Sequence, residues 1–175
     1  MILLNPVDVK CIVLHCSVSA FGDVDTITQW HTEKGYSTIG YHWVITNCFA
    51  TSESIRDKQP NLALDGAVHK GRSEKFRGAH AKGHNWETIG VCLIGGVTPD
   101  GSYIGFTSRQ LESAAKLCYE IKQRFPNSLD VKGHCEFAYT TKTCPELDMN
   151  FFRDFILPNV EEPVDPMFDP TILLK

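Results

Sequence analysis

Short segments with the composition of β-strands alternate along this chain with segments of helical periodicity. Residues 9–15 and 88–94 contain continuous apolar runs, and residues 41–46 are aromatic and β-branched, so we expect a strand in each. Residues 57–85 have little apolar periodicity and are rich in Gly, Lys, Arg and His, which predicts long loops. The alternation predicts an α/β fold: a single domain in which helices flank a central mixed β-sheet.

The clearest helix is predicted over residues 107–125. Thr107 and Gln110 can form a capping box at its start, and Pro126 would end it. The apolar side chains of this segment recur at helical spacing: Leu111, Ala114, Cys118, Ile121 and Phe125.

Two shorter helices are predicted on either side of it. Asp25 can cap a helix that ends near Gly35, and Asp148 can cap a last helix that ends at Pro158. The apolar face of this last helix is predicted to hold Leu147, Phe151 and Phe155. The residues that follow are rich in proline and acidic side chains. We therefore expect a folded domain of residues 1–157 and an acidic, Pro-rich C-terminal tail of residues 158–175.

The bulk properties exclude several classes of protein. A chain of 175 residues fits one domain, and its formal charge of −4, without a run of Lys and Arg, argues against a nucleic-acid partner. No stretch approaches the roughly 18 apolar residues of a membrane span. The amino terminus lacks the charged and apolar regions of a secretory signal peptide. We expect a monomer that is made in the cytoplasm and does not insert into a membrane.

Three residues have side chains typical of metal ligands. His15 ends a predicted strand, His134 follows Gly133, and Cys144 lies in a loop before the last helix. Two imidazoles and a thiolate suit zinc, and three protein ligands leave the fourth tetrahedral position for water. Cys16 and Cys135 compete with these ligands, but alternation along an extended chain points each away from the adjacent histidine.

The chain resembles the zinc-dependent N-acetylmuramoyl-L-alanine amidases, a family that includes amidase-type bacteriophage lysozymes and the peptidoglycan recognition proteins. The matching stretches occur in the family's order and cover roughly residues 9–156. They are Ile12-Val-Leu-His15-Cys-Ser, Trp30-His31, Gly40-Tyr41-His42-Trp-Val-Ile, Arg56-Asp57, His80-Ala-Lys-Gly83, Ile89-Gly-Val-Cys-Leu-Ile-Gly95, Gly133-His134-x-Glu136 and Lys142-Thr-Cys144-Pro145.

The resemblance implies that His15, His134 and Cys144 hold one Zn²⁺ per chain and that Tyr41 and Lys142 are the catalytic side chains. Zinc polarises a carbonyl and lowers the pKa of bound water to roughly 7. Lys142 is placed to stabilise the oxygen that becomes negative. Tyr41, which we expect to begin a strand beside that of His15, would orient water or transfer a proton.

Four further residues are candidates for substrate binding. His80, Lys82 and Asn85 either line the substrate groove or belong to a polar surface loop. Arg56 either grips a carboxylate of the stem peptide, which arginine does bidentately, or forms an ion pair with Asp57.

The family implies cleavage of the amide bond between N-acetylmuramic acid and L-alanine in bacterial peptidoglycan. The small single domain and the lack of a signal peptide lead us to expect a phage or prophage endolysin that acts on the cell wall. One alternative is recognition of peptidoglycan without cleavage. Members of that kind typically lack the cysteine ligand, so the presence of Cys144 favours an enzyme. A second alternative is regulation through a protein partner bound by the C-terminal tail.

Overall fold

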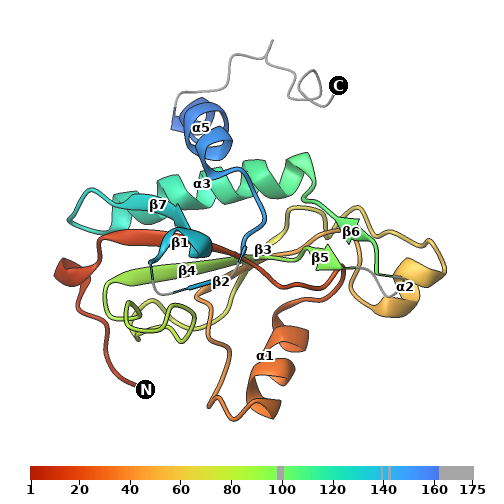
Figure 1. Ribbon diagram of the computed structural model, residues 1–175, viewed down its shortest axis with the longest axis horizontal. Coiled ribbons are helices and arrows are strands. Elements are labelled where there is room, and N and C mark those ends of the chain that lie inside the picture. The colour runs from red at the N-terminus through yellow and green to blue at the C-terminus, as the bar shows by residue number, and fades with distance from the viewer. Residues whose placement is uncertain (98–100, 139, 142, 162–175) are drawn as a thin grey trace.

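The computed structural model describes residues 1–97, 101–138, 140–141 and 143–161 of the chain (Figure 1). Five strands form one sheet in the order β3-β2-β4-β1-β7, and β5 pairs with β6 in a separate hairpin. The strands are β1 (Cys11–Cys16), β2 (Trp43–Ile45), β3 (Val68–Lys70), β4 (Thr88–Leu93), β5 (Gly96–Val97), β6 (Tyr103–Ile104) and β7 (Asp130–Gly133). The helices are α1 (Val24–Glu33), α2 (Ser52–Arg56), α3 (Ser108–Arg124), α4 (Met149–Phe151) and α5 (Pro158–Glu161). Two 3₁₀ turns, η1 (Pro6–Asp8) and η2 (His134–Glu136), and one π-helical turn, η3 (Phe152–Ile156), are also present.

The main sheet is mixed, as the sequence predicts. Strand β1 runs parallel to both β4 and β7, β2 runs parallel to β4, and β3 pairs antiparallel with β2 at the edge. Every residue of β1 and β4 is buried, because helices cover both faces of the sheet. The expectation that the segment starting at Tyr41 lies beside the strand of His15 is wrong in two respects. Strand β2 begins at Trp43, and β4 lies between it and β1.

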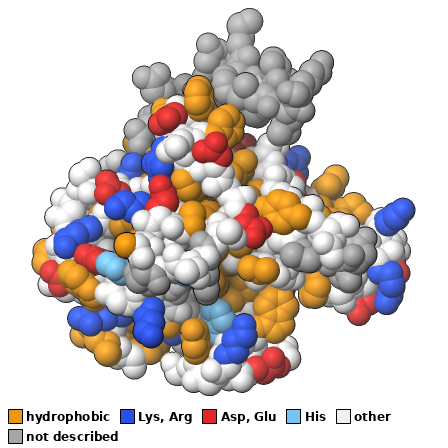
Figure 2. All heavy atoms as spheres, in the orientation of Figure 1, with side chains coloured by type: hydrophobic (Ala, Val, Ile, Leu, Met, Phe, Trp, Pro, Cys, Tyr) orange, Lys and Arg blue, Asp and Glu red, His pale blue; other side chains and the backbone are white. Residues whose placement is uncertain are grey.

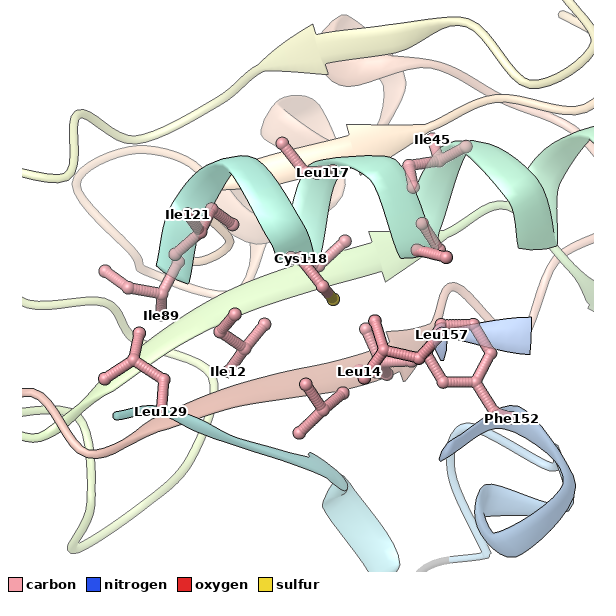
Figure 3. Close-up of a cluster of buried hydrophobic side chains, with 14 of the residues drawn as sticks. Ile12, Leu14, Ile45, Ile89, Leu117, Cys118, Ile121, Leu129, Phe152 and Leu157 are labelled. Atoms are coloured by element: carbon pink, nitrogen blue, oxygen red, sulfur yellow. The ribbon is translucent and has the colours of Figure 1, made fainter. Parts of the chain in front are cut away.

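Helix α3 closes one face of the sheet over the larger apolar core (Figures 1 and 3). Ile12 and Leu14, which alternate along β1, point toward Cys118 and Ile121 of α3. The predicted capping box is confirmed: Thr107 Oγ1 accepts from the Gln110 backbone N–H, and the Gln110 side chain accepts from the Thr107 N–H.

Helix α1 lies against the opposite face, over a smaller apolar cluster that includes Ile27, Val44 and Cys92. Its N-cap is Asp23, not Asp25 as the sequence suggests. Asp23 has the extended backbone of a cap and accepts from the Thr26 N–H, whereas Asp25 lies inside the first turn.

Two regions differ from their predicted structure. The segment 57–85 is not all loop, because β3 lies within it; this edge strand is largely exposed and therefore carries no apolar pattern. The last helix does not end at Pro158, which starts α5 instead; proline is tolerated in a first helical turn. Its apolar face also differs, because the π-helical turn η3 shifts the register and buries Phe152, while Phe155 is 56% exposed.

The C-terminal helices extend the fold past residue 157. Val160 of α5 packs against the larger core, and α5 contacts α3. The division of the chain at residue 157 stays a prediction that needs its own test. Residues 162–175 lie outside the described residues. None of the helices in the described part of the chain has the length and apolar character needed to cross a membrane. Basic and acidic side chains are interspersed over the face of the molecule shown in Figure 2.

Candidate metal centre

Three potential metal ligands converge at the carboxyl ends of β1 and β7. One ligand atom from each of His15, His134 and Cys144 lies within 4.8 Å of the other two, and all three residues are buried. Because β1 and β7 are parallel and Leu14 pairs with Gly133, the residues that follow this pair come side by side. The ring centroids of His15 and His134 are 4.6 Å apart. The convergence is therefore a consequence of the sheet register.

The loop that carries Cys144 is fixed against this edge by main-chain contacts. The Cys135 N–H donates to the Cys144 carbonyl at 2.7 Å, and the Cys16 N–H donates to the Cys144 Sγ at 3.2 Å. Gly133 allows the close approach, since a Cβ there would lie 2.8 Å from the Pro145 Cδ. Cys16 is not one of the three converging residues, but at the end of β1 it lines the same pocket as His15, so alternation along the strand does not remove it from the site.

Glu136 holds the turn that presents His134. Its Oε2 accepts from the Gly133 N–H at 2.7 Å, and both its oxygens accept from Arg153, at 2.8 and 3.0 Å. Burial alone would raise the pKa of Glu136, but the hydrogen bonds from Arg153 and the Gly133 N–H lower it below the usual value. The sequence marks Glu136 as part of a family motif, and its structural role is to support a ligand.

The donor set has the chemistry of a zinc site. Two imidazoles and one thiolate are ligands that zinc prefers, and three protein donors is the number typical of catalytic zinc centres. The hydrogen bond with the Cys16 side chain, together with burial, raises the pKa of the Cys144 thiol. A bound metal ion would favour the thiolate form at this position.

The ligands lie on the wall of a pocket of about 550 Å³. Tyr41, two residues before β2, lines the pocket, and its ring centroid lies 5.0 Å from that of His15. Tyr41 also packs against the apolar cluster that contains Cys92, the β4 residue that pairs with His15. Burial raises the pKa of Tyr41 well above its usual value, so its hydroxyl keeps its proton at neutral pH.

Helix α1 supplies a wall of the pocket that the sequence does not identify as functional. Ile27, Trp30, His31 and Lys34 all line it. The sequence feature that could have identified them is their spacing, which places them on one helical face. His31 also positions Tyr41, because its Nδ1 accepts from the Gly40 N–H at 2.8 Å and its ring lies 5.2 Å from that of Tyr41.

Two further histidines lie at or near the pocket. His42 is 1% exposed; its Nδ1 accepts from the Gly90 N–H, and its Nε2 lies 3.1 Å from the Phe76 carbonyl. Burial lowers the pKa of His42 to about 4, in keeping with its predicted structural role. His80 lines the pocket and lies within hydrogen-bonding distance of His15, at 3.0 Å.

The other predicted site residues are distributed differently. Within the described residues, Arg56, Lys82 and Asn85 are not part of the pocket lining. Arg56 forms the ion pair with Asp57 that was one of its two predicted roles. Lys82 is exposed, and the side chain of Asn85 binds the backbone of the His80 loop. Lys142 lies outside the described residues.

Comparison with known proteins agrees with this geometry. The sequence matches the N-acetylmuramoyl-L-alanine amidase family over residues 5–147. An endolysin of Enterobacteria phage T3 is 33% identical over 144 residues, which cover 80% of this chain and 82% of the endolysin.

Two solved structures share the fold. The N-acetylmuramoyl-L-alanine amidase LysC from Clostridium intestinale has a TM-score of 0.64 at 22% identity, covering 88% of this chain and 89% of LysC. AmpDh3 from Pseudomonas aeruginosa, solved in complex with an anhydromuramic pentapeptide, has a TM-score of 0.61 at 19% identity, covering 84% of this chain and 59% of AmpDh3. Since the family match spans most of the sequence and a relative of known class is one-third identical across most of both proteins, this chain belongs to the N-acetylmuramoyl-L-alanine amidase family.

Proposed function

We propose that this peptidoglycan amidase carries out its reaction at a single zinc ion held by His15, His134 and Cys144. The observation that carries the proposal is the convergence of three buried donor atoms on the wall of one pocket. The reaction is hydrolysis of the amide between N-acetylmuramic acid and L-alanine, in which the C–N bond breaks and water supplies the hydroxyl of the new carboxylate and the proton of the new amine. When bound, zinc would polarise the amide carbonyl and make water more acidic.

Tyr41 and Lys142 are the proposed catalytic side chains. The Tyr41 hydroxyl keeps its proton and lines the pocket beside His15, so it can donate that proton to the departing amine or orient the attacking water. Lys142 is two residues from a ligand in the sequence, and its ammonium would stabilise the oxygen that becomes negative in the tetrahedral transition state. Lys142→Ala should keep zinc and lose about 10²–10³-fold in turnover.

The substrate is the glycan-linked stem peptide of bacterial peptidoglycan. The family match supports this, and a protein of the same fold, AmpDh3, was solved with a muramyl peptide bound. Relatives named as endolysins support a phage or prophage origin. We propose that the chain is made in the cytoplasm and acts as a monomer on the wall. Gel filtration with light scattering tests the monomer.

The decisive experiment measures zinc content and amidase turnover on the same preparations. His134→Ala and Cys144→Ser should lose both zinc and activity, while Cys135→Ser, a matched thiol removal next to a ligand, should keep both. Mass spectrometry of digested muropeptides should show stem peptides with a free L-alanine amine. Full zinc occupancy in both ligand variants would refute the assignment of the site, and cleavage at another bond would refute the assigned reaction.

A further inference from the structure

We propose that His80 is a positioning residue for the metal centre: its Nδ1 accepts a hydrogen bond from the Nε2–H of His15 and thereby holds His15 in the tautomer that presents Nδ1 to the metal. This inference rests on the proposed zinc site. It gives His80 a role different from the substrate contact that its sequence position suggests.

The two ring nitrogens of His15 face different partners. Nδ1 lies 3.8 Å from the Cys144 Sγ, on the side where the ligand atoms converge. Nε2 lies 3.0 Å from the His80 Nδ1, with the two rings close to perpendicular. A neutral imidazole carries one ring proton, so a His15 that binds metal through Nδ1 must carry that proton on Nε2. The proton then points at the lone pair of the His80 Nδ1.

The His80 ring is seated so that this hydrogen bond is held in place. It packs on Gly78 and on Gly90, in the interior of β4; a Cβ on either glycine would lie 2.3 or 2.6 Å from the His80 Cδ2. Glycine within a strand often marks such a close approach. The Asn85 Oδ1 accepts from the N–H groups of both His80 and Ala81 at 2.9 Å, which fixes the backbone of the loop.

The second nitrogen of the ring is too buried to contact a substrate. The His80 Nε2 is a buried atom without a hydrogen-bond partner among the described residues. When Nδ1 accepts from His15, this Nε2 carries the proton, and leaving a buried donor unpaired costs stability. Stability alone therefore does not explain a histidine here, whereas an acceptor for a metal ligand does.

The choice of acceptor has a chemical consequence. Metal-bound histidines usually donate their second N–H to a carboxylate, a backbone carbonyl or water, and these partners fix the orientation of the ring. A neutral imidazole fixes the orientation as well, but it adds no negative charge beside the metal. The centre would keep the net positive charge of one zinc ion and one thiolate, which favours polarisation of a carbonyl.

The test compares two replacements of His80 and one matched control. In His80→Asn, the side-chain oxygen can accept the hydrogen bond from His15 in place of Nδ1. In His80→Leu, the side chain has no acceptor for this bond. His84→Leu removes a histidine from the same loop that pairs with Glu87. Zinc affinity is measured by competition with a chromophoric chelator, and the Co²⁺-substituted proteins are compared by their visible absorption spectra.

We expect His80→Leu to lose about 10–100-fold in zinc affinity and to change the Co²⁺ spectrum. His80→Asn should recover most of both, and His84→Leu should match the wild type. If Leu and Asn variants lose affinity equally, or if neither loses any, the positioning role is wrong while the zinc site stands. A wild-type protein that binds no zinc would instead refute the proposed function.

A measurement on the wild type does not depend on how the variants fold. Long-range ¹H–¹⁵N spectra of the zinc-loaded protein report which nitrogen of each histidine carries the proton. The inference requires the Nε2–H tautomer for both His15 and His80. An Nδ1–H tautomer at either residue would overturn it.

Discussion

On the α3 face of the sheet, β1 contributes Ile12 and Leu14 to a large apolar core, which α3 and Phe152 close. On the α1 face, His15 near the end of the same strand faces the pocket with Tyr41 and His80. The larger cluster consists of apolar side chains from most elements of the fold, whereas the smaller one is interrupted by histidines and by the pocket.

The two faces of the sheet therefore serve different purposes: the α3 face stabilises the fold, and the α1 face holds the groups of the proposed site. The hydrophobic contribution to folding scales with the apolar area removed from water, so the larger cluster on the α3 face contributes more of it than the smaller one. The α1 face buries polar groups, which cost free energy unless they are hydrogen-bonded or bind a metal. Changes on the two faces should therefore be distinguishable by experiment.

The largest expected effect is on the α1 face. Removal of zinc with a strong chelator should abolish turnover, and added Zn²⁺ should restore it, because zinc supplies the polarisation of the carbonyl. The far-ultraviolet circular dichroism should stay native, since the α3 core includes none of the three ligands. Global unfolding on chelation would show that the two faces are not separable.

Tyr41→Phe should lower turnover by about 10²–10⁴-fold with zinc content unchanged. The substitution keeps the ring contacts with His15 and His31 and removes only the proton-carrying hydroxyl. Turnover and zinc are measured on one preparation, with Tyr119→Phe on α3 as the control. If the Tyr41→Phe variant keeps wild-type turnover, Tyr41 has only a packing role.

On the α3 face, Ile121→Ala should destabilise the fold by about 2–5 kcal/mol, because it leaves a cavity among fully buried side chains. Urea unfolding measures this loss, and Ile121→Val should cost only about 0.5–1.5 kcal/mol. Zinc affinity and turnover at low temperature should match the wild type. A selective loss of zinc would mean that the core sets the geometry of the ligands.

Thr107→Ala should cost about 1 kcal/mol in stability, because it leaves the Gln110 N–H at the start of α3 without its side-chain acceptor. Thr107→Ser keeps the hydroxyl and is the matched control. Both variants should have normal turnover in the folded state. Equal stability of the Ala variant and the wild type would show that the cap contributes nothing here.

The smallest effects concern the C-terminus. Truncation after Glu161 should leave stability and turnover on soluble muropeptides unchanged, whereas truncation after Leu157 should lower the unfolding midpoint, because Val160 packs against the core. Turnover of both proteins is compared below their unfolding temperatures. If the protein truncated after Glu161 loses turnover, residues 162–175 take part in the reaction.

Local patterns in the sequence were sufficient for several elements. The apolar run of β1 and the capping box and periodicity of α3 are properties of neighbouring residues, so they could be read before the fold was known. The ligand types of His15, His134 and Cys144 were recognised through a family pattern, and the structure brings these three together.

Only the tertiary structure decided the rest. Strand β4 separates β1 from β2, and β3 forms at the edge, because pairing depends on partners distant in the sequence. His80 stands in a segment without apolar periodicity, and nothing local predicts that its ring would rest on Gly90 and face His15. The sequence by itself determined which side chains could bind a metal. The packing of β1, β4 and the His80 loop decided how one of those ligands is held, since a hydrogen bond between residues 65 positions apart exists only once the chain has folded.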